Sequence, residues 1–222
     1  MRTVGDRMDP ARRMVARLGP LPAPIATAMG TVPRDQFVPS ELRDRAYDDE
    51  PLPLPGDEAT ISAPHMVAIL LEYMDPRPGD KVLDIGTGSG YLAALAAEMV
   101  GPNGRVVTVE LDPHLAWEAQ QRLDRLGYTP RVTVRTGDGR LGVPSEAPFD
   151  RIVVSCATAR LEPAWIAQLA PNGAIVAPLG GPFEQQVVRY RAGAPQEEME
   201  RGPWCRFVAL RSANDDIYRP EK

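Results

Sequence analysis

A glycine loop and three acidic side chains in this sequence are placed where they could hold a small molecule. The loop, residues 86–90, has the spacing G-x-G-x-G and follows directly after a short strand-like run at 81–85. Glycine lets the backbone turn sharply there and lets a ligand approach without a Cβ in the way. Asp84 lies just ahead of the loop, and Glu110 and Asp138 follow the next two strand-like runs. Carboxylates in this order could bind a molecule that carries both hydroxyl and amino groups.

The spacing of these residues favours one cofactor over another. A dinucleotide fingerprint, G-x-G-x-x-G, would need a glycine at position 91, where the sequence has Tyr91. Asp84 would repel a diphosphate but attract the ammonium group of an amino acid. Glu110 is placed to accept hydrogen bonds from both hydroxyls of a ribose. Asp138, flanked by glycines, could accept one from an adenine amino group. The three acids therefore predict S-adenosylmethionine as the cofactor.

Each feature also has an ordinary structural explanation when it is taken alone. A G-x-G-x-G loop is often only a tight turn between a strand and a helix. Glu110 could be a solvated acid near a helix N-terminus, and Asp138 could be a turn residue. Their common position, at the ends of three successive predicted strands, favours the cofactor site.

The elements that must position these residues alternate between strand and helix. Such alternation predicts a doubly wound α/β fold, a Rossmann-like methyltransferase fold with a mostly parallel sheet covered on both faces. The last two strands are expected to be antiparallel. The predicted strands are 81–85, 105–109, 131–135, 150–155, 174–177, 186–191 and 206–210. The predicted helices are 65–74, begun by Pro64, then 91–100, 113–126 and 163–169, with a turn at 171–173.

Proline is concentrated in the first quarter of the chain, where it predicts turns and extended connectors. Short helices are predicted there at 25–31 and 40–45. We expect residues 1–62 to form a small N-terminal helical subdomain, residues 63–211 a methyltransferase domain, and residues 212–222 a polar tail.

The composition excludes several classes of protein. The 222 residues carry a net charge of −5 and contain no basic run, which argues against a nucleic-acid partner. No apolar run reaches the roughly 18 residues needed to span a bilayer. Two cysteines and two histidines provide too few ligands for a metal site and no disulfide framework. We expect a cytoplasmic monomer without metal.

Beyond these residues, the sequence resembles the protein-L-isoaspartate O-methyltransferase family over about residues 30 to 192. The most specific segments are VPRDQFVP at 32–39, AYDD at 46–49 and ATISAPHM at 59–66. The match continues through the glycine loop and the segments 137–139, 147–150, 168–173 and 178–180. The resemblance implies transfer of a methyl group from S-adenosylmethionine to the α-carboxylate of an isoaspartyl residue, whose ester collapses to a succinimide.

The resemblance also implies roles for individual residues. Ser62 matches the family's active-site serine. A carboxylate is already ionised at neutral pH, so no strong base is needed and a neutral hydroxyl can orient it. Ser62 could instead cap the helix begun by Pro64. The expected cofactor-binding residues are Ala59, Thr60, Ile61, His65, Asp84, Gly86, Thr87, Gly88, Ser89, Gly90, Glu110, Leu111, Asp138 and Gly139.

Three departures from the family pattern leave the substrate open. The segment 19–31 is rich in proline, the loop 155–160 is polar and carries Arg160, and 211–214 lacks a threonine that some members have. Cys156 in that loop is expected to pack rather than react. Repair of isoaspartate is favoured. The alternatives are a tailoring enzyme that esterifies a specific aspartate of a ribosomal peptide to form an aspartimide, and a non-catalytic binding module.

Overall fold

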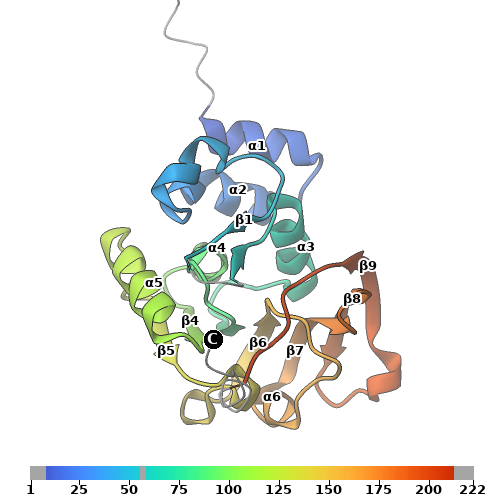
Figure 1. The fold of residues 1–222 in the computed structure, drawn as a ribbon. Coiled ribbons are helices and arrows are strands. Elements are labelled where there is room, and N and C mark those ends of the chain that lie inside the picture. The colour runs from blue at the N-terminus through green and yellow to red at the C-terminus, as the bar shows by residue number, and fades with distance from the viewer. Residues whose placement is uncertain (1–8, 56–58, 213–222) are drawn as a thin grey trace, which may run out of the picture.

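The computed structural model describes residues 9–55 and 59–212, and its centre is a seven-stranded sheet (Figure 1). The strands are β3 (Lys81–Ile85), β4 (Arg105–Glu110), β5 (Val132–Thr136), β6 (Phe149–Val154), β7 (Leu169–Gly180), β8 (Gln185–Arg191) and β9 (Glu200–Cys205). Their order is β5-β4-β3-β6-β7-β8-β9. Adjacent strands from β5 through β7 in this order are parallel. Strand β8 is antiparallel to β7, and β9 is antiparallel to β8. The predicted doubly wound sheet with antiparallel C-terminal strands is confirmed.

Helices pack on both faces of this sheet because strand side chains alternate between two cores. The helices are α3 (Pro64–Met74), α4 (Tyr91–Val100), α5 (Pro113–Arg125) and α6 (Pro163–Ala167). In β3, Val82 packs in the core that contains side chains of α3, α4 and α5, whereas Leu83 packs in the core that contains Trp165 of α6. The carboxyl ends of the parallel strands stay at one edge between these layers, where such folds bind ligands.

The N-terminal region packs directly on this layer of helices. It consists of α1 (Pro10–Leu18), α2 (Ala23–Thr31), two 3-10 turns, η1 (Arg34–Gln36) and η2 (Ser40–Arg45), and a small hairpin of β1 (Leu52–Pro53) with β2 (Thr60–Ile61). Met14 and Met29 share one core with Leu71 and Leu95 of α3 and α4, and Figure 1 shows α1 and α2 beside α3. The domain boundaries at 62 and 211 stay a prediction, and residues 213–222 of the expected tail lie outside the described residues.

Several N-terminal predictions are corrected by the structure. The predicted helix at 40–45 is a 3-10 turn. Helix α1 and the hairpin were not predicted. The sequence signal for α1 was nevertheless present, because Asp9 accepts a hydrogen bond from the backbone N–H of Ala11 and Pro10 occupies the first helical position.

The C-terminal half differs from prediction at two places. The predicted turn at 171–173 lies inside β7, whose register against β6 shifts there, and the preceding helix therefore ends at Ala167. The predicted strand at 206–210 is wrong. The last strand is β9, which contains Pro203 and lies at the sheet edge, where a missing backbone donor is tolerated. The segment after β9 runs back towards the middle of the sheet (Figure 1) and pairs once, Ala209 with Ala157.

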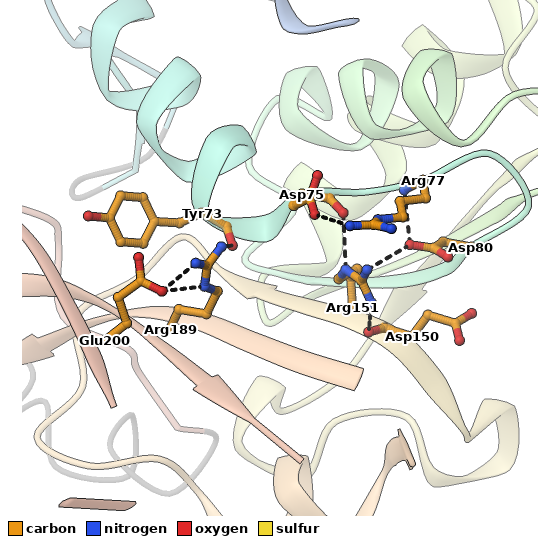
Figure 2. Close-up of polar contacts among 8 residues, drawn as sticks. All are labelled: Tyr73, Asp75, Arg77, Asp80, Asp150, Arg151, Arg189 and Glu200. Atoms are coloured by element: carbon orange, nitrogen blue, oxygen red, sulfur yellow. Dashed lines mark hydrogen bonds and ion pairs between the residues drawn. The ribbon is translucent and has the colours of Figure 1, made fainter. Parts of the chain in front are cut away.

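Arginines from two strands fasten the C-terminal end of α3 to the sheet (Figure 2). Arg189 of β8 donates to the carbonyl of Tyr73 at 3.3 Å, and Arg151 of β6 donates to the carbonyl of Asp75 at 3.2 Å. Cations beside the last carbonyls of a helix are favourable. The C-terminal end of α3 is thereby fixed to the sheet. The segment 59–66 leads into the N-terminal end of the same helix.

Candidate active site

One pocket lies over the carboxyl ends of β3, β4 and β6. It is enclosed by the second hairpin strand, the glycine loop, the residues after β4 and β6, and the segment after β9. Eleven of the predicted site residues line it: Ala59, Thr60, Ile61, Ser62, Gly86, Thr87, Gly88, Ser89, Glu110, Leu111 and Gly139. Four do not: His65, Asp84, Gly90 and Asp138.

The glycine loop passes too close to the residues after β6 to carry a side chain at its first position. Gly86 has φ = 94°, and a Cβ there would lie 2.9 Å from Sγ of Cys156 and 3.0 Å from Oγ of Ser155. Its backbone N–H donates to the carbonyl of Val109 at 3.0 Å, so the loop stays joined to β4. The close approach of the glycine loop to Ser155 and Cys156 therefore requires glycine at position 86.

Glu110 joins the end of β4 to the glycine loop. Its Oε2 accepts a hydrogen bond from the backbone N–H of Gly88 at 2.8 Å, and its Oε1 accepts one from Asp112 at 3.2 Å. The residue is 8% exposed and borders the pocket. A carboxylate held in this way keeps further acceptor positions for the hydroxyls of a ligand.

Asp84 lies beneath the loop, fully buried. Its Oδ2 accepts a hydrogen bond from Thr108 at 2.9 Å, and Thr108 in turn contacts Oγ1 of Thr87, a pocket residue, at 2.7 Å. Burial raises the pKa of Asp84 to about 7, although the Thr108 hydrogen bond lowers it. Within the described residues, its Oδ1 has no partner. Asp84 does not line the pocket, and its contact with the ammonium group of S-adenosylmethionine stays a prediction.

Asp138 lies next to a pocket residue but does not line the pocket itself. Its carboxylate accepts hydrogen bonds from the backbone N–H of Arg140 at 2.9 Å and from Ser212 Oγ at 2.7 Å. Its neighbour Gly139 is the residue that borders the pocket, and a Cβ there would lie 2.6 Å from Cγ2 of Ile85. The adenine contact of Asp138 stays a prediction.

Ser62 borders the pocket with its hydroxyl unengaged by the described residues. It does not cap α3. The cap position is Ala63, and the acceptor is supplied instead by Asp49, whose Oδ1 receives the backbone N–H of His65 at 2.9 Å. The same oxygen lies 2.9 Å from Nδ1 of His65, which keeps that side chain outside the pocket lining. The hydroxyl of Ser62 is therefore available for a ligand.

Sequence reasoning missed part of the pocket wall. Residues 208–211 after β9 and Leu92 of α4 also line it, as do Ser155 and Cys156. Burial raises the pKa of the Cys156 thiol to about 12, so it stays protonated and packs as expected. Arg160 lies in a neighbouring hollow. A local sequence signal could not reveal residues 208–211, because a nonlocal pairing brings them to the pocket.

The doubly wound sheet, the glycine loop and the acid at the end of the next strand define a Rossmann-like S-adenosylmethionine-dependent methyltransferase. Residues 21–215 match the family model described as Protein-L-isoaspartate(D-aspartate) O-methyltransferase. The chain belongs to this family.

Relatives and solved structures agree with this assignment. The chain is similar to the protein-L-isoaspartate O-methyltransferase of Methanopyrus kandleri, at 52% identity over 84% of this chain and 82% of the relative. It is similar to that of Hyperthermus butylicus, at 47% identity over 84% and 80%. A solved protein-L-isoaspartate O-methyltransferase has a TM-score of 0.79 at 25% identity, over 95% of this chain and 70% of that chain.

Proposed function

We propose that this enzyme methylates the α-carboxylate of L-isoaspartyl residues in peptides and proteins, the first step of their repair. The observation that carries the proposal is Ser62, which lines the same pocket as the glycine loop and Glu110 and whose hydroxyl is unengaged by the described residues. The family match spans all three. This chain departs from some members in its peptide-facing loops, but its cofactor pocket and its serine are intact.

One group of residues binds the cofactor, and Ser62 contacts the substrate. S-adenosylmethionine, when bound, supplies an electrophilic methyl group. Glu110 binds the ribose hydroxyls, and Asp84 attracts the ammonium group from below the loop. Gly139 lets the backbone approach the adenine ring, with Asp138 at its edge. Gly86 and Gly88 leave room for the amino-acid part.

Ser62 acts on the substrate side. It donates one hydrogen bond to the isoaspartyl carboxylate, which orients one oxygen towards the methyl group without neutralising its charge. The bound cofactor would supply its methyl group to a carboxylate oxygen that is already ionised, so the residues of this chain need remove no proton and provide no base. The following backbone amide nitrogen can then attack the ester, releasing methanol and closing the succinimide.

We further propose that the enzyme works in the cytoplasm as a monomer on peptide and protein substrates, without nucleic acid or membrane. Cys156 and Cys205 are both free, as expected in a reducing compartment. Along the described ranges, no helix is both long enough and apolar enough to cross a bilayer.

The test is methyl transfer from labelled S-adenosylmethionine to matched peptides that contain either isoaspartate or aspartate. We expect base-labile label on the isoaspartyl peptide only. Label confined to the aspartyl peptide would favour a tailoring enzyme, and cofactor binding without transfer to either peptide would indicate a binding module. Either result would contradict the proposal.

A further inference from the structure

Arg34 is a buried cation beneath the segment that carries Ser62. Its side chain is fully buried, with Nε donating to the carbonyl of Ala46 at 2.7 Å and Nη2 to the carbonyl of Ser62 at 3.0 Å. Its guanidinium carbon lies 5.1 Å from the ring centroid of Tyr91. Burial lowers the pKa of Arg34, and the charge of Asp49 acts against that lowering. Burying a charge is costly, so its partners matter.

Asp49 holds the other end of the same segment. Its Oδ1 accepts the backbone N–H of His65 at 2.9 Å, where no side chain of α3 itself provides a cap. The backbone from 62 to 65 is thus fixed at its first residue by Arg34 and at its last by Asp49. Both anchors come from the N-terminal region rather than from the main sheet.

Arg34 also connects this segment to the cofactor side of the pocket. Tyr91, the ring that it stacks on, is the first residue of α4, directly after the glycine loop, and borders the pocket. A hydroxyl can orient a carboxylate only if its own backbone is fixed, because a displacement of about 1 Å can slow a reaction by about 100-fold. No polar group of the described residues fixes the Ser62 hydroxyl itself, so its position depends on the backbone anchors.

We propose that Arg34 and Asp49 are positioning residues for methyl transfer: together they hold the backbone at 62–65 so that the Ser62 hydroxyl meets the substrate carboxylate. This inference rests on the proposed function of the site. It assigns a positioning purpose to Arg34 and Asp49, two residues of the N-terminal region that do not themselves line the pocket.

The test is a double-mutant cycle on the full chain. Arg34→Gln and Asp49→Ala are each made in the natural sequence and in Ser62→Ala. Turnover at saturating cofactor, KM for an isoaspartyl peptide, cofactor Kd and Tm are measured for all variants. We expect each single change to lower kcat about tenfold or more, with cofactor Kd changed less than about twofold. In the Ser62→Ala background the loss should shrink to about twofold or less, because the hydroxyl being positioned is gone.

Two control variants separate positioning from general stability. Arg131 also donates to a backbone carbonyl, that of Ala97 at 2.7 Å, and stacks on Tyr128 at 5.5 Å, but does not border the pocket. Arg131→Gln should lower Tm and leave kcat within about twofold at temperatures where it is folded. Glu50, beside Asp49, pairs with exposed Arg45, and Glu50→Ala should change neither.

The outcomes are distinguishable. No transfer to the isoaspartyl peptide by the unmodified enzyme contradicts the proposed function before any variant is made. If that enzyme is active, equal fold-losses of kcat in both backgrounds overturn the positioning role, as does a fully active Ser62→Ala. Should Arg34→Gln fail to fold, Arg34→Lys and Asp49→Ala decide the matter. Lysine keeps the charge but cannot bridge the two carbonyls in the same way, so we expect Arg34→Lys to retain only part of the kcat of the unmodified enzyme.

Discussion

Oε2 of Glu110 accepts the backbone N–H of Gly88 at 2.8 Å, so the acid that ends β4 and the loop that follows β3 form one unit. The adjacent pairing of these strands brings the two together. We assign ribose binding to the carboxylate of Glu110 and binding of the amino-acid part of S-adenosylmethionine to the glycine loop. The same carboxylate thus also sets the shape of that loop. A change at Glu110 should therefore act on cofactor binding through both contacts.

Glu110→Gln should weaken cofactor binding. The amide can still accept from Gly88, but hydrogen bonds to the ribose lose their charge assistance. We expect the Kd for S-adenosylmethionine to rise about tenfold, measured by calorimetry. Glu118→Gln, which removes an acid from α5 outside this pocket, is the control and should bind normally. An unchanged Kd for Glu110→Gln would remove Glu110 from the cofactor site.

Asp84 should give the cofactor-free enzyme a characteristic pH dependence. Burial raises its pKa to about 7 in the folded state, from an ordinary value of 3.8. Between these values the folded chain holds a proton that the unfolded chain has lost. The contribution of Asp84 to stability is therefore fully present at pH below about 4 and is lost as the pH rises to about 7.

The measurement is urea unfolding of the unmodified enzyme and of Asp84→Asn at several pH values without cofactor. The free energy of unfolding of the unmodified enzyme should fall relative to the variant by up to about 1.4 kcal/mol per pH unit over that window. Parallel profiles would show that Asp84 titrates normally.

Ser62→Ala should lower turnover and spare cofactor binding. The serine hydroxyl orients the substrate and has no assigned contact with the cofactor. We expect kcat to fall by about tenfold to 100-fold, with cofactor Kd changed less than about twofold. Steady-state kinetics on an isoaspartyl peptide, combined with calorimetry, separates the two effects. A loss of cofactor affinity without a loss of kcat would reverse the assignment.

Gly86→Ala should destabilise the chain more than Gly79→Ala. Both glycines have nearly the same φ, 94° and 92°, so the cost of the left-handed conformation is shared. A Cβ at 79 meets nothing within 4 Å, whereas one at 86 lies 2.9 Å from Sγ of Cys156. We expect the difference in unfolding free energy to be about 1–3 kcal/mol by urea titration. Equal losses of unfolding free energy in the two variants would mean that the loop shifts to accommodate the Cβ at position 86 without cost.

The fold of the central domain could be predicted because its signals are local. Proline at the first position of α3, α5 and α6, and alternation of strand and helix, mark the elements without knowledge of their neighbours. The pocket residues from 86 to 89 and Glu110 could be predicted for the same reason, since the loop follows one buried strand and Glu110 ends the next.

The remaining features depend on contacts between distant segments. Gly202 and Pro203 argue against a strand, yet β9 forms there because it pairs at the sheet edge with β8. The pocket wall at 208–211 exists because Ala209 pairs with Ala157. Asp49 caps α3 from outside the helix, which no capping pattern at 62–65 could reveal.

Mass spectrometry of an isoaspartyl peptide incubated with the enzyme and S-adenosylmethionine tests the central claim most directly. We predict a methyl ester on the isoaspartyl carboxylate, then a succinimide, and then aspartyl peptide that accumulates over repeated turnovers, while the matched aspartyl peptide stays unmethylated. An isoaspartyl peptide that stays unmethylated, while S-adenosylmethionine binds and other carboxylates are esterified, would contradict the account.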